Sequence, residues 1–170
     1  MHTTCYTPAD IWLLLEQVSD PEVPVLSVVD LGIIRHVEVF DRQGGQHVKV
    51  TITPTYSGCP AMDMIATNIR MELLMQGVHT VEIVNQLSPA WTTDWMTEAG
   101  KKKLKEYGIA PPVANISACE SSDVNEESGI QCPLCGSLQT HVVSHFGSTA
   151  CKALHQCDDC KEPFDYFKCH

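Results

Sequence analysis

The clearest structural pattern in the chain is Ile33-Ile-Arg-His-Val-Glu-Val-Phe-Asp-Arg-Gln-Gly-Gly-Gln-His-Val-Lys-Val-Thr-Ile-Thr53. Its first half places Ile33, Val37 and Val39 on one face of an extended segment. After Gly44-Gly45, the apolar residues Val48, Val50 and Ile52 alternate with Lys49, Thr51 and Thr53. Alternation with a period of two is typical of strands with one buried face. Two such strands on either side of a Gly-Gly turn pair most simply as a hairpin.

Helical patterns lie on both sides of this hairpin. Thr7-Pro8-Ala9-Asp10 combines a hydroxyl cap, an early proline and an acid, which predicts a helix start. The helix then carries an apolar stripe (Ile11, Leu14, Leu15, Val18) and is expected to end at Asp20-Pro21. The sequence then predicts a helix with a second apolar stripe over residues 62–73, a strand at 81–84 and a helix at 94–107. This order, αββαβα, predicts an α+β domain with a small mixed sheet covered by helices.

Composition and charge exclude several classes of function. Apolar residues make up 44% of the 170 residues, and the longest apolar run, 11–15, is far shorter than the about 20 residues that span a bilayer. The first residues lack the basic region and apolar core of a signal peptide. A net charge of −10 repels nucleic acid and anionic membranes. We therefore expect a cytoplasmic protein that binds proteins or small ligands, with neither a nucleic-acid nor a membrane partner.

The chain changes character after Pro111-Pro112. Residues 113–129 contain four acids, no bases and few apolar anchors, which is typical of a flexible linker. Six of the nine cysteines follow this stretch. We therefore predict three parts: a first domain at 1–112, an acidic linker at 113–129 and a cysteine-rich module at 130–170.

Two CxxC pairs, Cys132-Pro-Leu-Cys135 and Cys157-Asp-Asp-Cys160, predict a metal site in this module. Each pair can offer two thiolates from one tight turn, and four thiolates complete the tetrahedral shell that Zn²⁺ prefers. A segment of about 40 residues buries too little surface to fold alone, so metal binding would supply folding free energy. We therefore expect a four-cysteine zinc ribbon.

The role of this ribbon stays open between a structural zinc that presents a surface to a partner and an active metal site. Its net charge of −1 disfavours nucleic-acid binding. Cys151 and Cys169 lie outside the four predicted ligands. They are either buried thiols or additional soft ligands for an iron–sulfur cluster or a transferred metal. The histidines of the module are possible substitute ligands, although lone histidines are more often surface or core residues.

Cys59 lies in Ser57-Gly-Cys-Pro60, where a strand ends and a helix begins. Pro60 suits the first helical position, which would make Cys59 the N-cap. The helix dipole would then lower the pKa of the thiol, so that the thiolate could attack an electrophile or bind a soft metal. The alternative is a small residue packed in a turn. Asp20 and Glu22 form an acidic loop after the first helix, which by composition is a solvated turn.

Several motifs resemble known families. Asp20-Pro-Glu-Val-Pro-Val-Leu-Ser-Val-Val-Asp-Leu-Gly-Ile-Ile34, the Ser57–Pro60 turn and Pro89-Ala-Trp91 resemble the SufT-like domain of iron–sulfur assembly proteins. Phe146-Gly-Ser-Thr-Ala-Cys-Lys152 and Glu162-Pro-Phe-Asp-Tyr-Phe-Lys-Cys169 resemble the D-protein family of bacterial phenylacetate degradation. Members of that family belong with the multicomponent phenylacetyl-CoA epoxidase.

The resemblance implies a non-catalytic accessory protein, and not an enzyme, that helps to install an iron or iron–sulfur centre in the epoxidase. Its expected partners are the reductase or oxygenase component. Cys59 would be the reactive cysteine that handles a transient cluster, with Asp20 and Glu22 as the acidic motif. Because clusters are normally held by four thiolates, Cys59 would need ligands from a homodimer, from outside thiols, or from Cys151 and Cys169.

Two alternatives to this function remain. The chain could be a structural adaptor within the same complex that binds only zinc. It could also be a thiol enzyme with Cys59 as nucleophile, although no histidine lies between His47 and His79 to act as a nearby base.

Overall fold

The computed structural model describes residues 5–42, 45–56, 58–113 and 129–168. The chain forms two compact units. The first consists of Met1–Trp91 with Trp95–Thr97, and the second of Thr92–Asp94 with Glu98–His170. Each unit has its own β-sheet.

The sheet of the first unit has the order β1-β2-β3. Its strands are β1 (Ile34–Arg42), β2 (Gly45–Ile52) and β3 (Thr80–Asn85). β1 pairs antiparallel with β2, with Val37 opposite Val50, which confirms the predicted hairpin. β2 pairs in parallel with β3 through the connecting helix α2 (Met62–Met75), so the predicted strand at 81–84 and the helix before it are confirmed as well.

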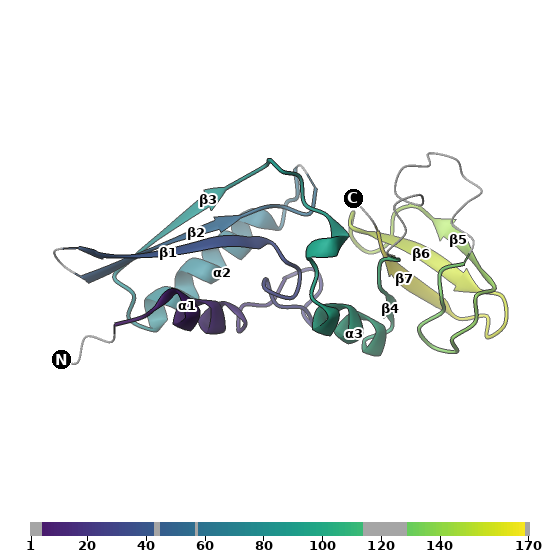
Figure 1. The fold of residues 1–170 in the computed structure, drawn as a ribbon. Coiled ribbons are helices and arrows are strands. Elements are labelled where there is room, and N and C mark those ends of the chain that lie inside the picture. Colours follow the sequence, from purple (N-terminus) through teal and green to yellow (C-terminus); the bar gives the residue numbers. More distant parts are fainter. Residues whose placement is uncertain (1–4, 43–44, 57, 114–128, 169–170) are drawn as a thin grey trace. The chain divides into compact units, whose positions relative to one another are not determined.

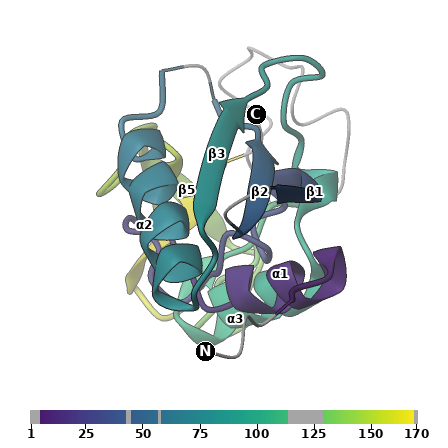
Figure 2. The same ribbon diagram turned by 90° about the vertical axis from the view of Figure 1, so that its left-hand side faces the viewer.

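Helices α1 (Pro8–Leu15) and α2 lie on the same side of this sheet (Figures 1 and 2). Thr7 caps α1 as predicted: its Oγ1 accepts a hydrogen bond from the Asp10 N–H at 3.3 Å. The Asp10 carboxylate in turn accepts one from the Thr7 N–H at 2.8 Å, which completes a capping box. The apolar stripes of both helices provide fully buried core residues (Ile11, Leu15, Ile69, Leu73). The predicted α+β fold class is confirmed.

Strand β2 is buried on both of its faces. Thr51 and Thr53, which the alternation placed on a polar face, are only 9% and 1% exposed. Lys49, on the same face, keeps 34% of its side chain exposed and pairs with Glu38 at 2.7 Å, so the polar positions of this strand differ in their exposure.

Tryptophans anchor the loop that precedes β1. Trp91 is 2% exposed, and its indole N–H donates a hydrogen bond to the Leu31 carbonyl at 2.9 Å. Gly32 has a φ of +67°, and a Cβ at this position would overlap the carbonyl group of Trp95. The Arg35 guanidinium lies over the Trp95 ring, 3.4 Å from its centroid. Glycine is required at position 32 because of its positive φ and because the Trp95 carbonyl occupies the space that a Cβ would need.

The sheet of the second unit has the order β4-β7-β6-β5. The unit contains α3 (Glu98–Glu106), β4 (Ile109–Ala110), β5 (Thr140–Ser144), β6 (Lys152–Cys157) and β7 (Pro163–Phe167). α3 begins later than the predicted helix at 94–107, after a 3₁₀ turn at Thr93–Trp95. Thr97 donates hydrogen bonds from its N–H and hydroxyl to Asp30 at 2.9 and 3.1 Å, and these bonds hold it outside the helix.

Strand β4 pairs in parallel with β7, with Ile109 opposite Asp165 and Ala110 opposite Tyr166. Residues that precede the predicted linker therefore belong to the sheet of the second unit. The predicted domain bounds, 1–112, 113–129 and 130–170, stay a prediction, and 114–128 lie outside the described residues. Among the described helices, none has both the length and the apolar character needed to cross a membrane.

Candidate functional site

The second unit brings together Cys132, Cys135, Cys157 and Cys160. Their Sγ atoms all lie within 4.8 Å of one another. Cys132 and Cys160 are 3.8 Å apart, and Cys135 and Cys157 are 3.5 Å apart. Cys132 and Cys157 are fully buried, whereas Cys135 is exposed. The four thiols therefore form one cluster, buried on one side and open on the other.

The two CxxC turns have the same backbone geometry. In each, the N–H of the residue after the second cysteine donates to the carbonyl of the first cysteine. The N–H of the first cysteine donates to the carbonyl of the residue two positions after the second cysteine. The bonds are Gly136–Cys132 (2.9 Å) and Cys132–Ser137 (2.8 Å) in one turn, and Lys161–Cys157 (3.0 Å) and Cys157–Glu162 (3.1 Å) in the other. Ser137 also donates a hydrogen bond to the Asp159 carboxylate, which links the turns.

The cluster fits a zinc ion. Four thiolates at the Zn–S distance of about 2.3 Å in a tetrahedron lie about 3.8 Å apart, close to the observed separations. Backbone N–H groups of Cys160 and Asp159 lower the pKa of Cys157 to about 7, although desolvation opposes this effect. The pKa of Cys160 is raised to about 12 and that of Cys135 is raised as well, because desolvation and the neighbouring thiols outweigh the backbone hydrogen bonds at Glu162 and Ser137, which are the largest single contributions and lower the two values. The four thiols therefore titrate as one set, and a bound metal would displace the remaining protons.

The remaining thiols of the ribbon differ from these four. Cys151 is 5% exposed, and its Sγ lies 3.0 Å from the Thr149 hydroxyl. Among the described residues, the cluster with metal-binding geometry consists of the other four cysteines. An additional ligand role for Cys151 stays a prediction, and Cys169 lies outside the described residues. His155 is fully buried beside the rings of Phe164 and Tyr166, as expected for a core histidine.

Cys59 lies in the connection between β2 and α2. Its N–H donates to the Tyr56 carbonyl, and its own carbonyl accepts from the Met62 N–H, both at 3.3 Å. Helix α2 begins at Met62, and its N-cap is Ala61. The prediction that Cys59 caps the helix was wrong, because residues 60–61 form a further turn before the helix begins.

The pKa of the Cys59 thiol is raised, which also corrects the expectation of a lowered value. Desolvation is the largest cause, and the negative charges of Glu22 and Asp20 add to it. Hydrogen bonds with the Ala61 backbone and the Tyr56 side chain act in the opposite direction. The fold therefore brings the loop of Asp20 and Glu22 within electrostatic range of Cys59.

Asp20 is not the solvated residue that the composition of its loop predicted. It is 7% exposed, and its Oδ1 accepts hydrogen bonds from the N–H groups of Glu22 (2.8 Å) and Val23 (2.7 Å). This arrangement, like that of a helix N-cap, fixes the loop that carries Glu22. Glu22 and Asp20 thus lie close enough to Cys59 to affect its pKa. The group with metal-binding geometry among the described residues is the four-cysteine cluster, so a cation site at Cys59, Asp20 and Glu22 stays a prediction.

Thr53 is a residue whose environment the sequence did not reveal. Its Oγ1 is buried and makes no hydrogen bond within the described part of the chain, at the start of the segment that leads to Cys59. The signal that was available is a hydroxyl residue at the end of a central strand, immediately before the Ser57–Pro60 motif.

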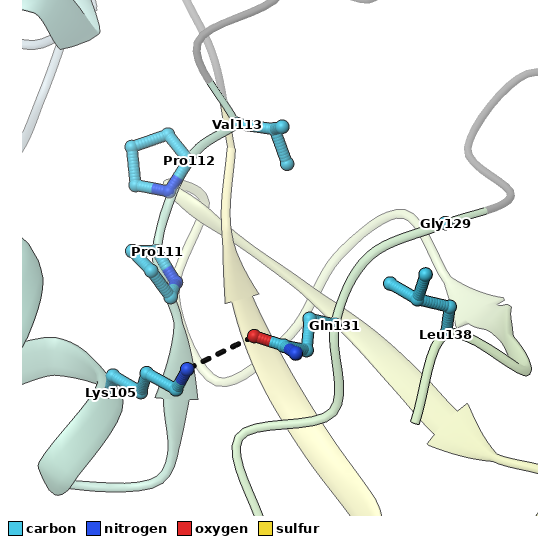
Figure 3. Close-up of a pocket in the computed structure, with 7 residues that line it drawn as sticks. All are labelled: Lys105, Pro111, Pro112, Val113, Gly129, Gln131 and Leu138. Atoms are coloured by element: carbon cyan, nitrogen blue, oxygen red, sulfur yellow. Dashed lines mark hydrogen bonds between the residues drawn. The ribbon is translucent and has the colours of Figure 1, made fainter. Parts of the chain in front are cut away.

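The second unit also contains a pocket of about 450 Å³ near the first CxxC turn (Figure 3). Pro111, Pro112 and Leu138 contribute to its apolar lining. On its polar side, Lys105 donates to the Gln131 side-chain oxygen at 3.0 Å, and Gln131 donates to the Gly136 carbonyl at 3.1 Å. Its lining residues include no cysteine, histidine or acid, so it is distinct from both cysteine sites.

In comparisons with known proteins, the region of Cys59 and the region of the four-cysteine cluster match different family models. A family model described as an iron–sulfur cluster assembly protein matches residues 8–83, and one described as the PaaD zinc beta ribbon domain matches residues 117–168. An Escherichia coli protein, provisionally named as a component of 1,2-phenylacetyl-CoA epoxidase, is 49% identical over 160 residues. That alignment covers 94% of this chain and 92% of the relative. The chain belongs to the PaaD family.

More distant relatives match a smaller part of the chain. An Fe-S protein maturation auxiliary factor of Porphyromonas gingivalis is 39% identical over 99 residues, which cover 58% of this chain and 90% of that protein. A solved structure of a conserved hypothetical protein of Thermotoga maritima has a TM-score of 0.50 and 30% identity, covering 61% of this chain and 98% of that one. A DUF59 domain structure from Bacillus anthracis has the same TM-score at 25% identity, covering 57% and 90% respectively. This chain therefore combines a region similar to these assembly proteins with a zinc ribbon.

Proposed function

We propose that the chain is an accessory protein of a phenylacetyl-CoA epoxidase that helps to assemble an iron or iron–sulfur centre in that complex. Cys59 binds the labile iron or cluster as cargo and passes it to a client component by ligand exchange. Asp20 and Glu22 assist at the same site. The chain itself is non-catalytic.

The observation that carries this proposal is the convergence of Cys59 with the Asp20–Glu22 loop. Desolvation, with a smaller contribution from the neighbouring carboxylates, raises the pKa of the Cys59 thiol, which disfavours its use as a nucleophile and so argues against a thiol enzyme. A bound cation reverses this balance, because its positive charge is attracted to the carboxylates and displaces the thiol proton. Such a site favours a metal over an organic electrophile. The name of the Porphyromonas gingivalis relative, an Fe-S protein maturation auxiliary factor, supports a role in metal-centre assembly, and the name of the Escherichia coli relative supports the link to the epoxidase.

The four-cysteine cluster has a different role in the proposal. Cys132, Cys135, Cys157 and Cys160 bind zinc, and the zinc stabilises the second unit. Two of these thiols are part of the hydrophobic core of that unit, beside Ala153, Phe164 and Tyr166. An ion that holds a core together is suited to a resident structural role, whereas a transferred ion must leave without unfolding its carrier.

The proposal is tested by producing the epoxidase components together with the wild-type chain, Cys59→Ala or Cys5→Ala. Cys5 is an exposed thiol of the same unit and serves as the matched control. Iron and acid-labile sulfide are then measured in each purified component. We expect Cys59→Ala to lower the iron or sulfide content of one component and Cys5→Ala to leave it unchanged.

The competing function is that of an adaptor that binds only zinc. In that case, client iron and sulfide would be the same with Cys59→Ala as with the wild-type chain, and the carrier role would be refuted. Circular dichroism and zinc analysis of the purified variants establish that each one is folded.

A further inference from the structure

Phe146 is exposed in the connection between β5 and β6, although aromatic side chains are usually buried. Its exposed fraction is 72%. It belongs to the Phe146–Lys152 motif, which neither the zinc cluster nor the Cys59 site uses. An exposed phenylalanine forgoes the stabilisation that burial would give, and its apolar ring is available to a partner.

The backbone around Phe146 is fixed by side chains from both flanking segments. The Ser144 hydroxyl donates to the Phe146 carbonyl at 2.9 Å and accepts from the Phe146 N–H at 3.2 Å. The Lys168 ammonium donates to the His145 carbonyl at 3.1 Å and lies 4.9 Å from the centroid of the Phe146 ring. The ring therefore has a defined position beside a positive charge.

The other half of the connection is held by a buried ion pair. The Lys152 ammonium lies 3.6 Å from the Asp165 carboxylate, with only 7% of the lysine side chain exposed. Asp165 also accepts a hydrogen bond from the Ser148 hydroxyl at 3.1 Å. A Cβ on Gly147 would lie 2.8 Å from an oxygen of Asp165, so glycine allows the close approach.

Neither the ion pair nor the exposed ring is a strong source of folding stability. Burial of an ion pair carries a desolvation penalty that the attraction between the charges often fails to recover. Exposure of a phenylalanine forgoes the gain from its burial. Their combined effect is an aromatic side chain that is ordered before any partner arrives. Interfaces gain affinity from such rigid aromatic anchors, because less conformational entropy is lost on binding.

The charges indicate the kind of partner surface. Lys168 and Lys152 accompany one acid, Asp165, in this cluster, so its local charge is positive on a chain of net charge −10. A complementary surface has an apolar pocket for the ring and a carboxylate at the rim facing Lys168.

We propose that Phe146 anchors the docking of this chain to a protein component of the epoxidase, and that this component has an apolar pocket with an acidic rim. This inference rests on the proposed function, because that function supplies the partner.

The test measures binding of the zinc-loaded full chain to the purified reductase and oxygenase components by surface plasmon resonance. We expect Phe146→Ala to weaken binding to one component by about 30-fold or more, as an anchor residue of about 2 kcal/mol would. Leu13→Ala is the matched control, because Leu13 is 60% exposed on α1 of the first unit, and it should bind as the wild type does. Lys168→Gln should weaken the dependence of the association rate on salt concentration.

Three outcomes would overturn the docking proposal. The first is that Phe146→Ala binds within about twofold of the wild type, and the second is that the wild-type chain binds neither component. The third is that Phe146→Ala changes only self-association, measured by analytical ultracentrifugation, which would make a second copy of the chain the occupant. The variant Cys59→Ala should still bind. If it binds normally and client iron is unchanged, the carrier function fails while the docking site stands.

Discussion

Gly136 and Lys161 occupy equivalent positions in the two CxxC turns. Each follows the second cysteine of its pair, and each donates its N–H to the carbonyl of the first cysteine. Their φ angles are +79° and +65°, so both lie in the left-handed region. Only one of the two turns has a glycine where the conformation favours it.

This difference predicts opposite effects for two substitutions. Gly136→Ala should destabilise the second unit by about 1 kcal/mol, because alanine is strained at a positive φ. Lys161→Gly should stabilise it by several tenths of a kcal/mol up to about 1 kcal/mol, because relief of strain exceeds the greater entropy of glycine in the unfolded chain. Thermal unfolding at a fixed zinc concentration checks both, and changes of the same sign would contradict the equivalence of the turns.

Removal of zinc should unfold the second unit and leave the first unit folded. The reason is that Cys132 and Cys157 are core residues of the second unit, whereas the first unit has a separate apolar core that includes Val50, Ile69 and Leu73. Amide NMR signals of β5 to β7 should collapse after chelation, while those of β1 to β3 remain dispersed. Acidification should act in the same direction, since protons compete with zinc for the thiolates. Persistence of dispersed β6 signals in metal-free protein would count against this account.

Glu22→Gln should lower the pKa of Cys59. The Glu22 carboxylate disfavours the thiolate, so its neutralisation removes part of the upward shift, whereas desolvation remains. The rate of iodoacetamide alkylation of the Cys59 peptide, followed by mass spectrometry against pH, should therefore shift to lower pH. Glu16→Gln, at an exposed position just after α1, provides the control and should leave the profile in place. A shift to higher pH in the Glu22 variant would mean that the two side chains do not interact as described.

Gly32→Ala should be much more destabilising than Gly77→Ala. Both glycines have positive φ angles, +67° and +94°, so alanine is strained at each by about 1–2 kcal/mol. Only at Gly32 would the new Cβ also overlap a backbone carbonyl, that of Trp95, whereas nothing lies within 4 Å at Gly77. Urea unfolding of both variants measures the difference, and equal losses of stability would show that the approach of Trp95 can relax.

Local patterns made the first sheet and the zinc cluster predictable. The alternation that ends in Val48, Val50 and Ile52 specifies a strand within a few residues. The CxxC spacing itself brings two thiols into one turn, so Cys132 and Cys157 could be assigned without knowledge of the fold. In both cases, the information lies within a window about as long as the element.

The environment of Cys59 was harder to predict because it depends on distant residues. Pro60 is a common first residue of a helix, yet the chain makes another turn and α2 begins at Met62. The raised pKa of Cys59 arises from burial and from the loop of Asp20 and Glu22, and neither is visible in the motif itself. The burial of Asp20 likewise comes from the backbone N–H groups that it binds and not from its polarity.

The pairing of β4 with β7 could not be foreseen for a different reason. Ile109–Ala110 is too short to show any period, and its partner strand lies near the other end of the second unit's sequence.

The same pairing has a consequence for how the ribbon can be isolated. A fragment that starts at residue 117, where the zinc ribbon match begins, keeps all four cysteines but loses β4. The edge of β7 at Asp165 and Tyr166 would then present unpaired backbone groups to solvent, and such edges template aggregation. During synthesis, β4 emerges from the ribosome before β7, so the two strands can pair only after β7 has been made. The shortest well-behaved ribbon therefore begins upstream of Ile109, so truncation at the apparent linker removes part of the fold.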